Sequence, residues 1–150
     1  MMNIHRRNFL KISSLAGLSA FLPTQAGFAS PKDTILEEAI RARIYEKLKS
    51  PVMIQTIELV RTQGELFVRV VSTDGATGIT QCNDRMNNLG SLLKGLVVPF
   101  FTGKDARDIV FLTEEVYRVN SHYKYAGMPL WNCIGHVEIA IWDLLGKMSA

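Results

Sequence analysis

The stretch Leu66–Cys82, LFVRVVSTDGATGITQC, contains the pattern that decides the fold. Its first six residues are rich in β-branched and aromatic side chains, which favour a strand. Asp74-Gly75 is a strong hairpin signal. We therefore expect a second strand across Thr77 to Cys82 that runs antiparallel to the first.

One more strand is expected upstream of this hairpin. Apolar and polar residues alternate with a period of two from Met53 to Arg61. The residues RTQG at 61–64 form a turn signal before Leu66. Two consecutive tight turns cannot join parallel strands, so the sequence predicts a three-stranded antiparallel meander.

Helical patterns flank the meander on both sides. Upstream, Thr34–Glu37 fits a capping box that opens a helix ending at Ser50-Pro51, with a solvated polar face that includes Arg41. Downstream, three helices are expected: residues 89–97, which stop at Pro99, a helix opened by residues 103–105, and a strongly apolar helix over residues 129–147. Strands followed by helices indicate an α+β fold, here a three-stranded antiparallel meander followed by a helical bundle.

The N-terminal segment HRRNFLK, residues 5–11, precedes a mildly apolar run from Ile12 to Leu22. A positive region, a short apolar region and small residues near a cleavage site are typical of a secretory signal. The pair Arg6 and Arg7 indicates the twin-arginine route, so we expect the translocation machinery as a partner and a periplasmic location. The alternative is an ordinary basic amphipathic N-terminus.

The charge of the chain comes from this segment. Lys+Arg number 17 and Asp+Glu 14, and three of the cations, Arg6, Arg7 and Lys11, lie in residues 1–29, which contain no acid. The remainder is therefore neutral, which argues against nucleic acid or an anionic membrane as a partner. We expect three parts: a signal peptide at 1–29, an N-terminal helix and linker at 30–51, and one small domain at 52–150.

Cys82 and Cys133 occur without a Cys-x-x-Cys motif and without histidines at metal-ligand spacing, so no metal site is expected. A periplasmic protein permits a disulfide. A twin-arginine substrate, however, folds in a reducing compartment before export. Two buried free thiols are therefore the favoured prediction, with a disulfide as the alternative.

Three motifs lie on these elements in a definite order. They are STDGATG at 72–78, PFFTGKDA at 99–106 and AIWDLLGK at 140–147. Together with the order of strands and helices, they resemble the N-terminal capping domain of the enolase superfamily, most closely the mandelate racemase and muconate lactonizing branch. The resemblance implies an α+β domain of that type without a (β/α)₈ barrel.

The chemistry that the resemblance implies belongs to a longer protein, in which a second domain follows the cap. Members of the superfamily remove the proton α to a carboxylate and stabilise the product on Mg²⁺, using residues of a barrel that follows the cap. This sequence stops at Ala150, where such a barrel would begin. We therefore expect no catalytic residue and no cofactor in this chain, and a missing or separate barrel domain as its partner.

Two functional hypotheses follow from this resemblance. In the first, the chain is the capping domain of an exported dehydratase, racemase or epimerase of hydroxy or sugar acids, truncated and inactive alone. In the second, it is a stand-alone periplasmic module that binds a ligand or a partner.

In the family, two loops of the cap select the substrate. The first corresponds to Arg61–Gly64, which is short here, and the second to Gln81–Asn88. We predict that Asn83, Asp84 and Arg85 contact the substrate, since an arginine can pair bidentately with a carboxylate. The alternative is a plain polar turn, because Asn and Asp are common in turns for local backbone reasons.

Other polar groups on the last helix are assigned structural roles. Glu138 and Asp143 are spaced so that they do not share a helix face, which argues against a carboxylate dyad. Asp143 is expected to make structural hydrogen bonds at the seam with a barrel, and His136 to be a satisfied core or interface residue. The segment 122–125, HYKY, is interpreted as a surface turn rather than a sugar-stacking loop.

The last helix also bears on self-association. Without a barrel, its outer side is expected to leave Trp131 or Trp142 partly exposed. An exposed apolar patch favours association, so a homo-oligomer is a further expected partner state.

Overall fold

The computed structural model describes residues 31–119 and 125–150. The chain divides into two compact units, Met1–Ile35 and Leu36–Ala150. The described part of the first unit is the beginning of helix α2. The predicted export signal, with Arg6 and Arg7, lies outside the described residues. The sheet, the core and the grooves all belong to the second unit.

A three-stranded antiparallel sheet forms one layer of the second unit. Its strands are β1 (Ile54–Thr62), β2 (Glu65–Ser72) and β3 (Thr77–Gln81), in the order β1-β2-β3. The predicted meander is therefore confirmed. At the first hairpin, Gln63 and Gly64 both have positive φ, 50° and 88°. Two such residues between paired strands are typical of a type I′ turn, which explains why this loop is short.

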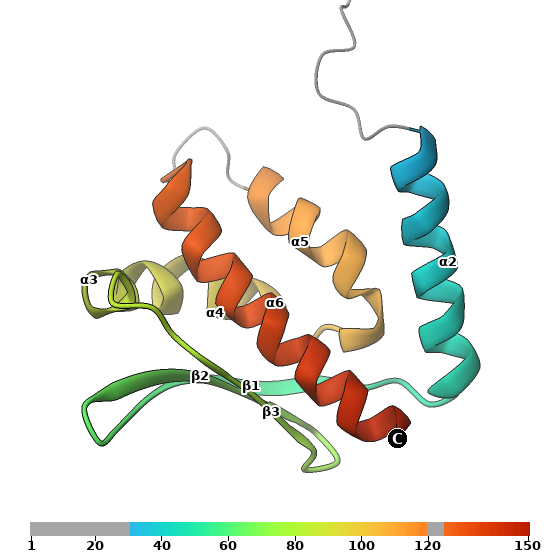
Figure 1. The fold of residues 1–150 in the computed structure, drawn as a ribbon, viewed down its shortest axis with the longest axis horizontal. Coiled ribbons are helices and arrows are strands. Elements are labelled where there is room, and N and C mark those ends of the chain that lie inside the picture. The colour runs from blue at the N-terminus through green and yellow to red at the C-terminus, as the bar shows by residue number, and fades with distance from the viewer. Residues whose placement is uncertain (1–30, 120–124) are drawn as a thin grey trace, which may run out of the picture. The chain divides into compact units, whose positions relative to one another are not determined.

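Helices cover one face of this sheet (Figure 1). The longest, α6, crosses β2 and β3 and makes the most extensive helix–sheet contacts. The helical segments are α2 (Pro31–Lys47), α3 (Met86–Leu92), a π-helical turn (Leu93–Val97), α4 (Val98–Phe101), a 3₁₀ turn (Ala106–Asp108), α5 (Ile109–Arg118) and α6 (Met128–Ser149). The predicted α+β class, with a meander followed by helices, is confirmed.

The hydrophobic core lies between the sheet and α6. Along β2, Leu66, Val68 and Val70 are buried, while Arg69 points to the exposed face. This alternation follows from the two-residue period of a strand with one face against helices. The side chains that α6 buries are Leu130, Cys133, Ile134, Val137, Ala140, Ile141, Leu144 and Leu145.

Helix α2 begins earlier than predicted. Its first residue is Pro31, so Thr34 lies inside the helix and cannot be its N-cap; the predicted capping box is wrong. Proline fixes φ near the helical value and lacks an N–H that the first turn would leave unpaired, so it starts a helix well. The predicted apolar stripe also begins in solvent, because Leu36 is 60% exposed.

The helical segment after the sheet also differs from the prediction. It starts at Met86, whose side chain is fully buried, and it continues past Pro99 to Phe101. The π-helical turn Leu93–Val97 shifts the hydrogen-bonding register, and Pro99 then lies in the first turn of α4, where its missing N–H is tolerated. Pro99 therefore does not end the helical segment.

The prediction for the two cysteines is confirmed. Cys82 and Cys133 are free and buried, as predicted. Burial raises the pKa of Cys82, and it raises the pKa of Cys133 to about 11. Among the described helices, none is long and apolar enough to cross a bilayer.

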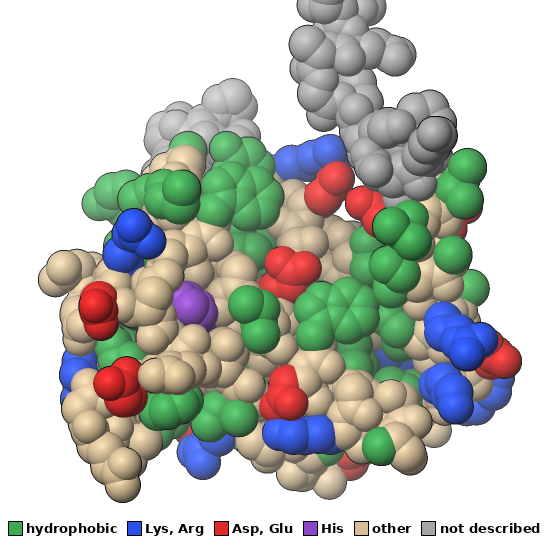
Figure 2. Space-filling view, in the orientation of Figure 1, with side chains coloured by type: hydrophobic (Ala, Val, Ile, Leu, Met, Phe, Trp, Pro, Cys, Tyr) green, Lys and Arg blue, Asp and Glu red, His purple; other side chains and the backbone are tan. Residues whose placement is uncertain are grey.

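The outer side of α6 carries apolar groups, as expected. Trp131 is 44% exposed and Ile139 54%, whereas Trp142 is half-buried. Figure 2 shows apolar patches on this face, interrupted by acidic side chains. The Trp131 ring stacks on Tyr117 with centroids 4.5 Å apart.

Candidate functional site

The two predicted substrate-selecting loops are joined by one arginine at the end of β1. The Arg61 guanidinium donates to Asn87 Oδ1 at 2.6 Å and to the carbonyl of Gly64 at 3.2 Å. The hairpin tip and the start of α3 lie at the same end of the sheet (Figure 1). Arg61 therefore links the hairpin tip to the first turn of α3.

The second loop is shorter than predicted. Gln81 is the last residue of β3 and α3 begins at Met86, so the irregular segment comprises only residues 82–85. Asn87 and Asn88 lie in the first turn of α3, not in a loop. The burial of Met86 explains this, because a buried apolar side chain at that position draws the chain onto the core.

Within this segment, the three predicted site residues have different roles. All three are exposed. Asn83 Oδ1 accepts a hydrogen bond from the Arg85 backbone N–H at 3.1 Å, the pattern of an Asx turn. Asn83 thus matches the plain-turn alternative. No side-chain partner for the Asp84 carboxylate or the Arg85 guanidinium is found among the described residues, and both charged groups extend into solvent.

His136 of α6 contacts this segment through a hydrogen bond. His136 Nε2 accepts a long hydrogen bond, 3.5 Å, from the Asn83 backbone N–H. Burial lowers the pKa of His136, so the ring is neutral at pH 7 and Nδ1 carries the proton. Nδ1 and Asn132 Oδ1 are buried without a partner among the described residues. The prediction of a satisfied histidine is therefore correct for Nε2 only.

Asp143 makes structural hydrogen bonds, and they lie within this domain. Its carboxylate accepts from the Ile79 backbone N–H at 2.8 Å and pairs with Lys147 at 2.6 Å. The Lys147 ammonium and the Ile79 amide together lower the pKa of Asp143. Glu138 instead accepts from the Trp142 indole at 3.4 Å. The two carboxylates have separate partners, in accord with the absence of a dyad.

No group of three or more His, Cys, Asp or Glu side chains that could hold a metal ion is found in residues 31–119 and 125–150. Of the predicted surface turn at 122–125, residues 122–124 lie outside the described residues, and Tyr125 is 71% exposed. The described part of the chain thus offers exposed charged and polar groups at its loops, Arg85 among them.

The contact between the loops was not predicted from the sequence. The sequence predicts Arg61 to be a turn residue and Asn87 to be part of a longer loop. An arginine at the end of a strand, directly before a tight turn, was the available signal, because its side chain extends past the hairpin.

Comparison with known proteins finds no matching family model. The chain is 32% identical over 97 residues to a D-galactonate dehydratase family member of Paenibacillus sp. (strain JDR-2), a match that covers 61% of this chain and 23% of that protein. A solved structure described as a racemase from Roseobacter denitrificans is 31% identical, with a TM-score of 0.55, and the match covers 63% of this chain and 26% of that one.

A second solved structure is a mandelate racemase/muconate lactonizing protein from Paracoccus denitrificans PD1222 complexed with magnesium. It is 22% identical with a TM-score of 0.53, and the match covers 65% of this chain and 28% of that one. The chain spans about a quarter of the length of the proteins it matches. The likeness establishes the fold: an α+β domain of the enolase N-terminal type.

Proposed function

We propose that this chain is the N-terminal capping domain of an enolase-superfamily enzyme that acts on hydroxy or sugar acids as a dehydratase, racemase or epimerase. The observation that carries the proposal is the likeness of fold and sequence to proteins described as racemases and as a D-galactonate dehydratase family member. Galactonate, mandelate and muconate, the compounds named in two of these descriptions, are carboxylic acids. The barrel that would perform the reaction is the expected partner of this domain.

Magnesium belongs to this proposal through the longer relatives. Two of the similar solved structures are described as complexes with magnesium. In the proposal, a longer protein holds Mg²⁺ with carboxylates outside the described residues of this chain, and the metal stabilises negative charge that develops on the substrate. The contribution of this chain is to select the substrate and to exclude water above the site.

Arg85 is the residue to which we assign substrate selection. Its guanidinium is exposed and has no described partner, so it can form a bidentate pair with a carboxylate without first breaking another contact. Arg61 is a positioning residue, since it fixes the hairpin tip against Asn87. Asn83 shapes the turn through its bond to the Arg85 amide.

The test uses the native gene product with Mg²⁺ and a panel of hydroxy and sugar acids. For the acid that is turned over, Arg85→Gln is expected to raise KM about tenfold, the loss of one charge-assisted contact, while the melting temperature is unchanged. Arg118→Gln is the matched control, because Arg118 is exposed on α5 and pairs only with Glu114 in the described part of the chain. An unchanged KM in Arg85→Gln would contradict the assignment of Arg85, and failure to turn over any acid would contradict the proposed reaction.

We further propose that residues 1–29 direct export by the twin-arginine route and that the protein is periplasmic. The support is the sequence RRNFLK, followed by an apolar run in which Gly, Ser and Ala are interspersed with larger apolar residues. Cell fractionation tests this: the double variant Arg6→Lys, Arg7→Lys is expected to stay in the cytoplasm, while the unmodified chain reaches the periplasm. Export of the double variant at the normal level would contradict this route.

A further inference from the structure

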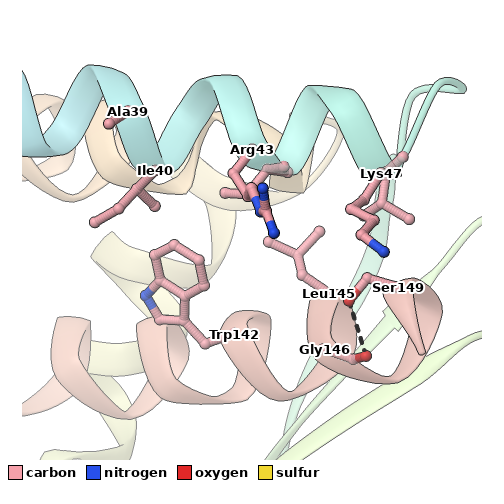
Figure 3. A pocket seen from close by; sticks show the side chains of 10 residues that line it. Ala39, Ile40, Arg43, Lys47, Trp142, Leu145, Gly146 and Ser149 are labelled. Atoms are coloured by element: carbon pink, nitrogen blue, oxygen red, sulfur yellow. Dashed lines mark hydrogen bonds between the residues drawn. The ribbon is translucent and has the colours of Figure 1, made fainter.

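A groove of about 470 Å³ separates helices α2 and α6 near the end of α6 (Figure 3). Its walls are apolar. Ile40 and Ile44 line it from α2, and Trp142 and Leu145 line it from α6. In Figure 3 the Trp142 indole extends from α6 toward Ile40 across the gap. The groove is thus bounded by side chains of two helices rather than being a flat patch on one.

The gap exists because α2 is held by polar contacts on another of its sides. Arg41 and Tyr45 both bind Asp108 Oδ1, at 2.8 and 2.9 Å. Arg107 donates to the carbonyl of Leu48 at 3.0 Å and lies over the Tyr45 ring. These polar contacts anchor α2 to the segment around α5. On the side that faces α6, Ile40 and Ile44 are half-buried and line the groove, and Ile44 also packs against the core.

The mouth of the groove is positively charged. Arg43 and Lys47 are one helical turn apart on α2, and both extend toward α6 in Figure 3. No Asp or Glu lines the groove. The only ionic contact described for Arg43 is an exposed one with Glu46 at 3.8 Å. For Lys47, no ionic partner is found among the described residues. Two cations therefore stand beside an apolar space with no neutralising acid in it.

We propose that this groove binds a small amphipathic carboxylate, a molecule with an apolar chain or ring and one anionic head. The apolar body would lie between Ile40, Ile44 and Trp142, and the carboxylate would pair with Arg43 and Lys47. Charge complementarity selects this occupant over a neutral one. A groove of about 470 Å³ is within the size range of pockets that hold a single small molecule.

This site is distinct from the loops assigned to substrate selection. The groove lies at the C-terminal end of α6, at Trp142 to Gly146, whereas the loop residue Asn83 contacts α6 at His136. No residue is shared between the two sites, so a substitution that tests one leaves the other in place.

The test titrates the full chain with monomeric decanoate and, separately, with decanol. Isothermal calorimetry gives the affinity, and tryptophan fluorescence in a Trp131→Phe background reports on Trp142. We expect one decanoate per chain, a change in Trp142 emission, and decanol binding at least tenfold weaker. Lys47→Gln is expected to weaken decanoate binding about five- to tenfold, the value of one charge-assisted contact. Lys49→Gln, an exposed lysine outside the groove lining, is the matched control.

A second pair of variants tests the location by filling the space. A Cβ at Gly146 or at Gly135 meets no atom within 4 Å, and both glycines lie in α6, but only Gly146 lines the groove. Gly146→Leu is expected to abolish decanoate binding, and Gly135→Leu to preserve it, with both variants folded by circular dichroism.

Three results would overturn the proposal. They are equal affinity for decanol and decanoate, equal loss of binding in Gly146→Leu and Gly135→Leu, and binding to phosphatidylglycerol vesicles without binding of monomeric decanoate.

Discussion

Helix α6 meets β3 on one side and α2 on another, and the two contacts are built in different ways. At β3 the backbones approach so closely that a side chain at Gly78 would overlap the Ala140 carbonyl and come within 2.6 Å of the Leu144 amide. Between α2 and α6 a groove remains, and α2 is held instead by polar contacts outside the groove, such as the hydrogen bond from Arg41 to Asp108. Close approach requires a residue without a side chain, whereas a helix held by ion pairs can stay apart from its neighbour.

The two contacts of α6 also differ in how much they contribute to the stability of the fold. The β3–α6 contact buries apolar surface in the core, which is the main source of stability. Among the contacts that hold α2, the Arg41–Asp108 pair lies near the surface, where ion pairs contribute little. We therefore expect the domain to tolerate changes at α2 far better than changes at the β3–α6 contact.

The largest effect is expected from Gly78→Ala. The new methyl group would clash with the backbone of α6, which cannot rotate away as a side chain can, so the free energy of unfolding should fall by about 3 kcal/mol or more. Urea denaturation measures this. Gly146→Ala is the matched control, since a Cβ there meets open space and alanine favours a helix; it should be neutral or slightly stabilising. Similar stability of both variants would show that the β3–α6 contact is not close-packed.

The next largest effect is expected at the ion pair between Arg107 and Asp105, which lies beside the end of α2 and is the most buried ion pair among the described residues. The side chains of Arg107 and Asp105 are 8% and 17% exposed, and their charged atoms are 2.7 Å apart. Arg107→Met would leave the Asp105 carboxylate without its partner, with an expected loss of about 3 kcal/mol. Arg118→Met changes an exposed arginine in the same way and should have little effect in the same urea titration. A loss equal to that of the control would contradict the importance of this pair.

The same pair predicts a pH dependence of smaller size. Burial alone would raise the pKa of Asp105, but the hydrogen bonds from the Arg107 side chain and from the backbone amides of Arg107 and Val52 lower it overall. A carboxyl whose pKa is lower in the folded state stabilises the fold at pH values above its unfolded pKa of about 4, and this stabilisation is lost as the pH falls through the folded value.

Unfolding titrations between pH 6 and pH 3 test this sign. The unmodified protein should lose stability as the pH falls below about 4, and Asp105→Asn should lose less over the same range because it has no charge there to lose. Parallel curves for the two proteins would contradict the account of Asp105.

The smallest effect is expected from Arg41→Gln. Arg41 pairs with Asp108 through an exposed contact, and its guanidinium also lies over the Phe111 ring. Exposed ion pairs are screened by water and salt, so the change in denaturation midpoint should lie near the limit of detection. A loss as large as that of Arg107→Met would show that α2 is held mainly by this exposed pair, and would remove the contrast between the two contacts.

The meander was predictable because its signals are local. The turn at 61–64 and Asp74-Gly75 each lie between runs with the period of a strand, and strands joined by tight turns can pair in only one way. The attachment of α2 was not predictable, since Arg41 occupies a polar helix face that looks solvated in sequence. Its partner, Asp108, is 67 positions away. Only the folded chain brings the two together.

The candidate site was predicted in part for the same reason. The exposure of Arg85 follows from a polar run after a strand, and the structure agrees. The helical start at Met86 was missed, because its burial depends on the core and no local pattern signals it. The Arg61–Asn87 contact was not predicted because it joins the end of β1 to the first turn of α3, and these two segments are separate in sequence.

The central claim is that this domain caps a longer enzyme, and the size of the native gene product tests it most directly. A denaturing gel, probed with an antibody against residues 52–150, gives that size. Since the matched segment is about two thirds of this chain and about a quarter of the related proteins, the account predicts a band about three times as large as the 16.8 kDa of this chain. A single band at 16.8 kDa or slightly below would contradict it and would favour a stand-alone binding module.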